Sequence, residues 1–436
     1  MKSKLPLSAM VLAGLSLGTA WAIRGQFGHE QGAAWAGAIG SLSVLLLARR
    51  QDWYNRAFKA TLAGALGWGI GGIMSYGIIV GYGRDAEFVN VYYGFLMLFV
   101  IGGLYGFLGG GLFGLALSDG TRGRGVSWSS LIVEMTVGAL LFYFFLIEQF
   151  GWLMTPPRSE LWAACMGAAA ALTWYLVRNR YYAALRVAVF AGLGGGFGFA
   201  FGNFLQVLGQ VSGIEFNFWN LMEYSLGFFG GAGMAYGTFT SLWEEPEGEA
   251  TRNGTLFPLL LLAVVIPFIV WDQSFGIERL TETFVTIGGS ETIVGLVQWV
   301  TLLLILVLAV FWINKYYWSR PLGTVVYSHS AIKAFFLGHF VLYIVFSLLI
   351  TGAFLSTYRI EQYLYLLNFG VILLMINKVE ANFSENGLHP KKWGIGLVTV
   401  GLVVALLAFI AINTHDELPN AHKRFGQHSA DPKAGT

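Results

Sequence analysis

The sequence predicts an all-α polytopic membrane protein with about thirteen transmembrane helices. Hydrophobic residues make up 56% of the 436-residue chain and charged residues only 11%, about half the charged fraction of a typical soluble protein. Several uninterrupted apolar runs reach the roughly 18 to 20 residues that a helix needs to cross a bilayer. Because lipid offers no partners to backbone polar groups, we expect these runs to be helical.

The first apolar segment, MKSKLPLSAMVLAGLSLGTAWA, has the basic start, apolar middle and small residues of a secretory signal. Its pattern VLAGLSLGTAWA (11–22) recurs in TLAGALGWGIGG (61–72) and VFAGLGGGFGFA (189–200). A cleaved peptide has no reason to share a pattern with later segments. We therefore expect this segment to be retained as the first transmembrane helix.

The remaining spans follow at short intervals, and the basic residues between them set the orientation. With a cytoplasmic N-terminus, inside segments hold eighteen of the 26 Lys and Arg residues and outside segments hold eight, as the positive-inside rule requires. This predicts a multi-pass protein of a bacterial-type inner membrane, with its C-terminus outside, in the periplasm. The predicted spans are 6–22, 31–48, 61–81, 91–117, 128–149, 160–177, 186–208, 219–241, 256–272, 293–313, 332–354, 361–377 and 394–413.

An acidic stretch, WEEPEGEATRNGT at 243–255, is the clearest break in composition. We interpret it as a cytoplasmic linker between a Gly-rich eight-helix repeat domain at 1–242 and a five-helix membrane domain at 256–413. The tail at 414–436 has few apolar residues, which predicts a disordered end outside the membrane.

Glycines in the first half recur with small-xxx-small spacing, as in GGLYGFLGGGLFG (102–114) and GFFGGAGMAYG (227–237). This spacing lets helix backbones approach closely. Glycine also favours breaks where backbone lines a cavity, as in the discontinuous helices of transporters. Tight packing alone is the simpler interpretation.

The hairpins of the first half are predicted to be parallel repeats. Segments 11–22, 61–72 and 189–200 run in one direction, and each is followed by a similar string: GAAWAGAIG (32–40), GLYGFLGGG (103–111) and SLGFFGGAG (225–233). This alignment places Glu30, Ile101 and Glu223 at one position and brings Arg24 level with Asn203. If the hairpins pack around a common axis, these polar groups converge on a cavity open to the outside.

Charged groups at membrane depth are costly unless paired or hydrated, so each is a functional candidate. The predicted substrate-binding residues are Arg24, His29, Asn203, Trp35, Tyr76, Trp219 and Tyr224. The predicted ion-coupling residues are Glu30, Glu223 and His339. An arginine can hold an anion bidentately, and a partly buried glutamate or a histidine can carry a proton near neutral pH.

These residues favour a secondary transporter of a small polar solute, anionic or polyhydroxy, coupled to a proton or another cation. One alternative is a membrane-embedded enzyme with an outward-facing active site that acts on a lipid-linked or periplasmic substrate, using Glu30, His29 and Glu223 as acid and base. A second is a structural or assembly subunit in which Arg24 and Glu30 merely staple a hairpin. Whether the protein is an enzyme stays open, with transport favoured.

Several classes of function are excluded or disfavoured. The net charge of +2 and scattered basic residues lack the footprint of a nucleic-acid binder. The single cysteine, Cys165, excludes an intramolecular disulfide and a zinc site of cysteine type. Motifs for nucleotide, zinc or nucleophile-elbow chemistry do not occur. We expect no cofactor and no metal, and the partners are a small-molecule solute and the lipid bilayer.

Overall fold

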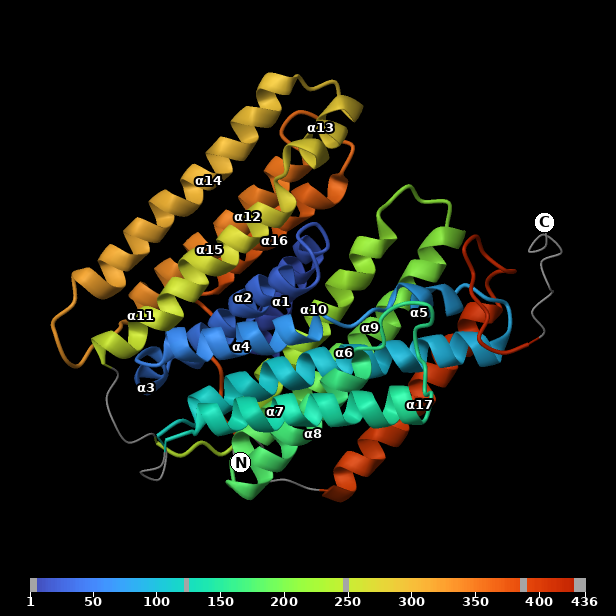
Figure 1. Ribbon diagram of the computed structural model, residues 1–436, viewed down its shortest axis with the longest axis horizontal. Helices are drawn as coiled ribbons and strands as arrows, with labels where there is room; N and C mark the ends of the chain where they lie inside the picture. The colour runs from blue at the N-terminus through green and yellow to red at the C-terminus, as the bar shows by residue number, and fades with distance from the viewer. Residues whose placement is uncertain (1–5, 121–124, 246–250, 385–389, 427–436) are drawn as a thin grey trace.

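The computed structural model describes residues 6–120, 125–245, 251–384 and 390–426, which form helices joined mostly by short loops (Figure 1). An isolated antiparallel β-bridge pairs Thr251 with Thr324. The helices before the acidic linker are α1 (Leu7–Arg24), α2 (Glu30–Ala48), α3 (Gln51–Tyr54), α4 (Ala57–Gly71), α5 (Gly77–Tyr82), α6 (Phe88–Leu117), α7 (Trp128–Tyr143), η1 (Phe144–Gln149), α8 (Trp162–Arg178), α9 (Tyr182–Val211) and α10 (Phe218–Phe239).

The helices after the linker include two prolonged by π-helical turns. They are α11 (Arg252–Leu260), η2 (Leu261–Val265), α12 (Ile266–Ser274), α13 (Ile277–Thr286), α14 (Glu291–Ile313), η3 (Asn314–Trp318), α15 (His329–Thr351), α16 (Ile360–Met375) and α17 (Pro390–Ile412).

Within the described residues, nine helical segments are long and apolar enough to cross a membrane, so the chain belongs to the class of multi-pass helical membrane proteins. Each of the thirteen predicted spans overlaps at least one helix. The helices α4, α8 and α16 fall below 18 residues, and α10 is long enough but rich in glycine and polar residues. The prediction of one continuous helix at 61–81 is wrong, because the chain leaves the helix after Gly71 and re-enters it at Gly77.

Six helices of the first half close into a ring. Around it, α1 packs against α2, α2 against α4, α4 against α6, α6 against α9, α9 against α10, and α10 against α1. The ring therefore consists of three hairpins around one axis. The aromatic side chains of Trp21, Trp68 and Tyr105 fill its interior, with the Trp21 ring 5.0 Å from that of Trp68 and 5.1 Å from that of Tyr105.

Glycine allows the ring to be this tight. A Cβ atom on Gly102 of α6 would lie 2.3 Å from the carbonyl oxygen of Gly195 on α9, and one on Gly195 would lie 2.4 Å from the Gly102 carbonyl oxygen. Any larger residue would push the two backbones apart. The helices therefore approach closely, as expected of small residues at membrane helix crossings.

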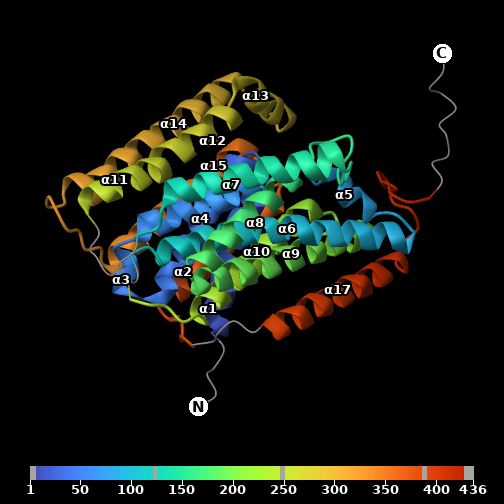
Figure 2. The same cartoon turned by 60° about the horizontal axis from the view of Figure 1, so that its bottom comes forward.

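The other helices cover the outside of the ring. Helix α15 packs against α1 and α2, α16 against α1, and α11 against α4, whereas α8 packs against α6 and α9. Helix α17 also packs against α6 and α9, and Figure 2 shows it on the far side of the ring from α11–α14. The segment 256–413, predicted as one five-helix unit, is therefore divided in space between two faces of the ring.

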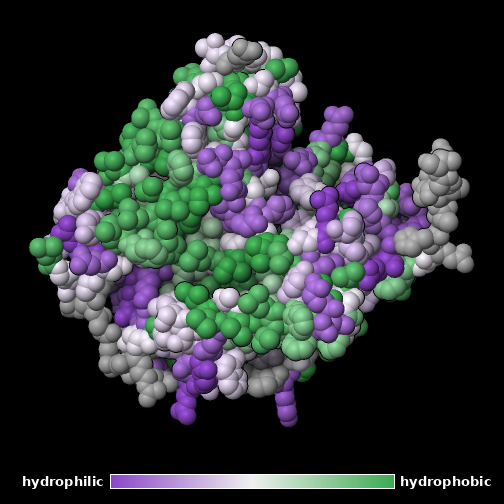
Figure 3. Space-filling view, viewed as in Figure 1, coloured by the Kyte–Doolittle hydropathy of each residue, from purple (hydrophilic) through white to green (hydrophobic). Residues whose placement is uncertain are grey.

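The surface separates into apolar and hydrophilic regions. Apolar side chains cover the middle of the molecule over α7 and α11, and hydrophilic ones gather at the end where α5 and the residues after α17 lie (Figure 3). Helix α2 is central, with 94% of its spanning window buried, whereas the window that begins in α14 is only 28% buried. The exposed flanks of α7, α14 and α17 are suited to contact lipid.

Residues 414–426 do not behave as the predicted disordered tail. The Leu418 and His422 amides donate to the carbonyl oxygens of Arg84 and Gly81 at 3.0 Å each. The side chain of Asn90 binds the backbone of Arg424 and Phe425. This part of the tail is thus folded against α5 and the start of α6; the remainder, 427–436, lies outside the described residues.

Candidate functional site

A buried ion pair joins the end of α1 to the first turns of α10. The Arg24 Nη2 atom lies 2.7 Å from Glu223 Oε2, and each side chain is only 1% exposed. The two residues are 199 positions apart in sequence, and closure of the ring brings them together. A charge pair with so little exposure has a large desolvation cost, so loss of one partner is strongly destabilising.

Two aromatic residues complete the hydrogen bonding of the carboxylate. The Tyr76 hydroxyl donates to Glu223 Oε1 at 2.8 Å and accepts from Arg24 Nη2 at 2.7 Å. The Trp21 Nε1 group donates to Glu223 Oε2 at 3.0 Å. The Arg24 guanidinium also lies 5.0 Å from the centre of the Trp21 ring, which adds a cation–π contact. Three donors therefore hold Glu223, and they come from α1 and from the junction between α4 and α5.

The position of Tyr76 depends on the break between α4 and α5. Helix α4 ends within the Gly-rich string GIGGIMSYG, and the chain resumes as α5 at Gly77. A Cβ atom on Gly72 would lie 2.3 Å from the His29 carbonyl oxygen. The lack of a side chain at Gly72 lets the broken segment press against the α1–α2 turn, with Tyr76 aimed at the ion pair.

His29 lies on the other side of Arg24, with its Nδ1 atom 3.3 Å from Arg24 Nη1. For this nitrogen to accept a hydrogen bond, the ring must be neutral with its proton on Nε2. Partial burial and the neighbouring Arg24 guanidinium lower the pKa of His29. The ring is therefore neutral at physiological pH, and the guanidinium resists its protonation.

A cavity of about 530 Å³ lies against this cluster. Its walls come from the α1–α2 turn, the broken segment between α4 and α5, the start of α10, the loop before α8, and the tail. The lining residues are His29, Glu30, Gly72, Ile73, Met74, Ser75, Tyr76, Gly77, Ile78, Arg158, Trp219 and His422. His29 and Tyr76 thus line the cavity and also contact Arg24, so the ion pair lies directly beneath its wall.

The structure unites six of the residues predicted for this site. Arg24, Glu223, Tyr76 and His29 form the cluster, and Glu30 and Trp219 line the adjoining cavity. The rings of Trp219 and Tyr76 stack 6.5 Å apart. The alternative staple between Arg24 and Glu30 does not form, because Glu223 is the partner of Arg24.

The other four predicted residues lie elsewhere. Asn203 bonds Gln206 on its own helix, and Tyr224 lies 3.4 Å from the Asn368 side chain. Trp35 stacks on Tyr343 and donates to the His339 carbonyl oxygen. The buried His339 ring lies between those of Phe335 and Trp35, and its Nε2 atom has no partner among the described residues.

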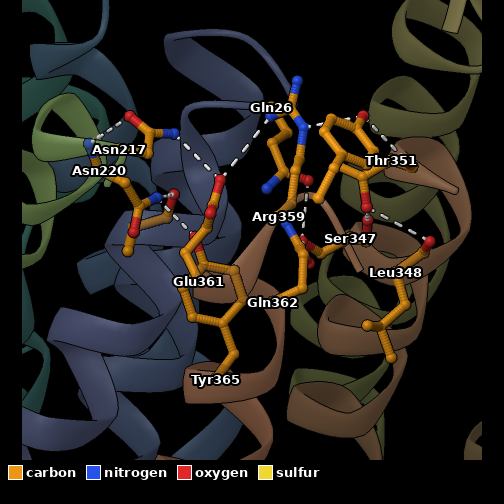
Figure 4. Close-up of polar contacts among 12 residues, drawn as sticks. Gln26, Asn217, Asn220, Ser347, Leu348, Thr351, Arg359, Glu361, Gln362 and Tyr365 are labelled. Atoms are coloured by element: carbon orange, nitrogen blue, oxygen red, sulfur yellow. Dashed lines mark hydrogen bonds and ion pairs between the residues drawn. The ribbon is translucent and has the colours of Figure 1, made fainter. Parts of the chain in front are cut away.

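A second polar cluster connects α10 to the helices of the second half (Figure 4). The Asn217 side chain donates to Glu361 at 3.1 Å, and that of Asn220 donates to the Tyr365 hydroxyl and to the Ala22 carbonyl oxygen. Nearby, Ser347 lies within hydrogen-bond distance of Gln26 and Gln362. Helix α10 therefore carries the ion pair on one face and is fixed to α1 and α16 by its first turn.

The sequence prediction missed Trp21, Arg158 and His422. Trp21 falls within an apolar run and looks like an ordinary core aromatic residue. Arg158 lies in a loop and His422 in the tail, and only the folded chain brings them to the cavity. Searches of the chain against protein-family models, curated proteins and solved structures found no match.

Proposed function

We propose that the protein is a secondary transporter of a small polar solute, anionic or polyhydroxy, coupled to a proton or another cation. The single observation that carries this proposal is the buried Arg24–Glu223 pair, bridged by Tyr76 from a broken helix and set against a cavity. Ionisable residues in membrane segments line substrate or ion pathways, and transporter sites are built where helices are discontinuous.

In this proposal, Glu223 carries the coupling ion. As a carboxylate it neutralises Arg24 and draws together α1, α10 and Tyr76. Protonation removes the charge that holds Arg24, so the three elements can separate and the wall of the cavity can move. Glu30 at the cavity edge supplies the proton, and His29 and Trp219 contact the solute.

The proposal extends to topology. We infer thirteen membrane crossings, parallel hairpin repeats in the first half, a cytoplasmic N-terminus and a bacterial-type inner membrane. The ring of three hairpins supports the repeat, and the positive-inside count supports the orientation. With this orientation the cavity opens to the outside, since the α1–α2 turn follows the first crossing.

The test is uptake by proteoliposomes that contain the purified protein. Short carboxylates, inorganic phosphate, sulfate and hexoses are offered with and without an inward proton gradient. We expect one class to accumulate only with the gradient. Glu223→Gln should abolish accumulation, and size-exclusion chromatography selects the folded fraction of this destabilised variant for the assay.

The matched control is Glu134→Gln, because Glu134 pairs with Arg178 at the same 2.7 Å on a more exposed part of the bundle. It should transport like the unmodified protein. Gradient-driven accumulation that persists in folded Glu223→Gln would rule out the coupling role. A protein that moves none of these solutes and no protons would contradict the transport proposal itself.

A further inference from the structure

Once the Arg24–Glu223 pair is set aside, the cavity lining keeps one guanidinium, that of Arg158, as an anchor for an anion. The two charges of that pair neutralise each other and are buried, so Arg24 is not free to bind a solute anion. The remaining ionisable side chains in the lining are Arg158, His29, His422 and a single carboxylate, Glu30. None of the ion pairs between described residues engages Arg158.

Arg158 comes from a loop with a well-organised backbone. The carboxylate of Glu160, only 6% exposed, accepts hydrogen bonds from the amides of Met154 and Thr155 at 2.8 Å each. The Arg158 amide donates to the Thr155 carbonyl oxygen at 2.7 Å. The guanidinium is therefore presented from a fixed turn at the edge of the cavity.

The tail is fixed beside this loop by buried polar groups. Asn90, fully buried, accepts from the Arg424 and Phe425 amides at 2.9 and 2.8 Å and donates to the Phe425 carbonyl oxygen at 3.0 Å. The Arg424 side chain donates to the Leu153 carbonyl oxygen at 2.9 Å. The loop and the tail are thus joined directly.

The lack of a side chain at Gly81 leaves room for the His422 ring. The His422 amide donates to the Gly81 carbonyl oxygen, and a Cβ atom at Gly81 would lie 2.1 Å from the His422 ring. One residue further on, Lys423 lies 3.9 Å from Asp85 and 2.6 Å from Glu417. Figure 1 shows this segment beside α5, at the same end of the molecule as the cavity-lining residues of α5.

We propose that the cavity selects an anionic solute, and that Arg158 and the tail segment 418–425, which carries His422, form the wall that recognises it. The inference rests on the proposed function for the role of the cavity and narrows the solute to one chemical class. It also moves anion recognition from Arg24 to Arg158. A carboxylate, sulfate or phosphate group would sit between Arg158 and His422, next to the stacked rings of Tyr76 and Trp219.

The charge of the cavity can be measured without knowing the solute. Ser75 lines the cavity, and the native Cys165 is buried, so Ser75→Cys provides a reactive thiol with little background. Its modification rate is measured in detergent with the anionic sulfonatoethyl and the cationic trimethylammonioethyl methanethiosulfonates. The ratio of the two rates is normalised to that of Ser130→Cys, which is exposed near the start of α7.

We expect the anionic reagent to be favoured at least threefold at Ser75→Cys, because local positive charge concentrates anions. Adding Arg158→Gln should lower the ratio at least threefold, Arg158→Lys should preserve it, and the matched loop control Arg180→Gln should leave it unchanged. A ratio of one or less, or a ratio insensitive to Arg158→Gln, would overturn the anion assignment.

The contribution of the tail is tested by Lys423→Glu, which places a third acidic group beside Asp85 and Glu417. We expect both reagents to react faster at Ser75→Cys and the preference for the anion to fall. His415→Glu changes the charge of the same tail outside the lining and should do neither. Unchanged rates in Lys423→Glu would show that the tail is not a wall of the cavity.

The two proposals fail in different ways. A positive cavity that binds anions in a protein without transport activity would refute the proposed function and leave this inference standing. Coupled uptake of an uncharged hexose that Arg158→Gln does not impair would refute the inference and leave the transport proposal standing.

Discussion

Neutralising Glu223 should destabilise the fold far more than neutralising an equally close but more exposed carboxylate. The Arg24–Glu223 and Arg178–Glu134 pairs both have an N···O distance of 2.7 Å. The first pair is 1% exposed on both sides, whereas Arg178 and Glu134 are 43% and 26% exposed. Any large difference between the two variants therefore reports burial and the extra hydrogen bonds of Glu223, and not the distance between the charged atoms.

The expected loss of stability depends on the charge that each variant leaves without a partner. Glu223→Gln strands the buried Arg24 charge, and breaking one side of a buried pair costs about 3–5 kcal/mol. Glu134→Gln leaves Arg178 solvated, and exposed pairs contribute roughly 0–1 kcal/mol. The double variant Arg24→Gln/Glu223→Gln removes both buried charges, so its cost should fall below the sum of the single variants by at least about 2 kcal/mol.

The assay is equilibrium unfolding in mixed micelles with increasing dodecyl sulfate, followed by tryptophan fluorescence. Free energies of unfolding are compared for the unmodified protein, the two single variants and the double variant. If Glu223→Gln and Glu134→Gln cost the same, or if the double variant is additive, Arg24 is hydrated or otherwise compensated. The buried ion pair would then not be the centre of this site.

Three further predictions concern neighbouring groups, each with a control in the same chain. Tyr76→Phe should lower the free energy of unfolding by about 1.5–3 kcal/mol, because the Tyr76 hydroxyl bonds both Arg24 and Glu223. The control Tyr105→Phe should lower it little, since the Tyr105 hydroxyl has no partner among the described residues. Equal losses in the unfolding assay would contradict the role given to Tyr76. Gly72→Ala should lower the free energy of unfolding by about 1–3 kcal/mol, because the added methyl group overpacks the contact. Gly77→Ala should be tolerated, because no atom lies within 4 Å of its Cβ position. Thermal unfolding of the two variants tests this difference. The lowered pKa of His29 means that the unfolded chain takes up a proton below pH 6.5 before the folded protein does, so this residue lowers stability as pH falls through that value. The melting temperature of His29→Gln should therefore fall less between pH 7.5 and 5.5 than that of the unmodified protein, and identical slopes would contradict this reasoning.

The polar members of the cluster could be predicted because they stand out against an apolar background. Arg24 and Glu223 are costly in a membrane segment, and the repeat alignment placed them near the same end of the bundle. The pairing itself was beyond the sequence. Two residues 199 positions apart meet only because three hairpins close into a ring, and nothing local distinguishes Glu223 from Glu30 as the partner of Arg24.

The sequence predictions that were wrong have specific physical causes. Alignment of Gly- and Ala-rich strings fixes the helical register poorly. It places Asn203 level with Arg24, although the Asn203 side chain bonds within its own helix. The break after Gly71 goes with a close contact between Gly72 and the His29 backbone, and no pattern within 61–81 reveals this long-range contact. The tail looked disordered because it is polar, yet Asn90 satisfies its backbone groups.

Helix α10 links these features. Its first turn bonds α16 through Asn217 and Asn220, and Asn220 also bonds the Ala22 carbonyl oxygen, close to Trp21 and Arg24 on α1. Trp219 of the same first turn lines the cavity, and one turn further on Glu223 holds Arg24. A change in the charge of Glu223 therefore acts on a helix that touches the cavity on one side and the second half of the chain on the other. In the proposed transport cycle, a movement of α10 would therefore reach α16, because α16 packs against α1 and is bonded to the same first turn of α10 that carries the cavity wall.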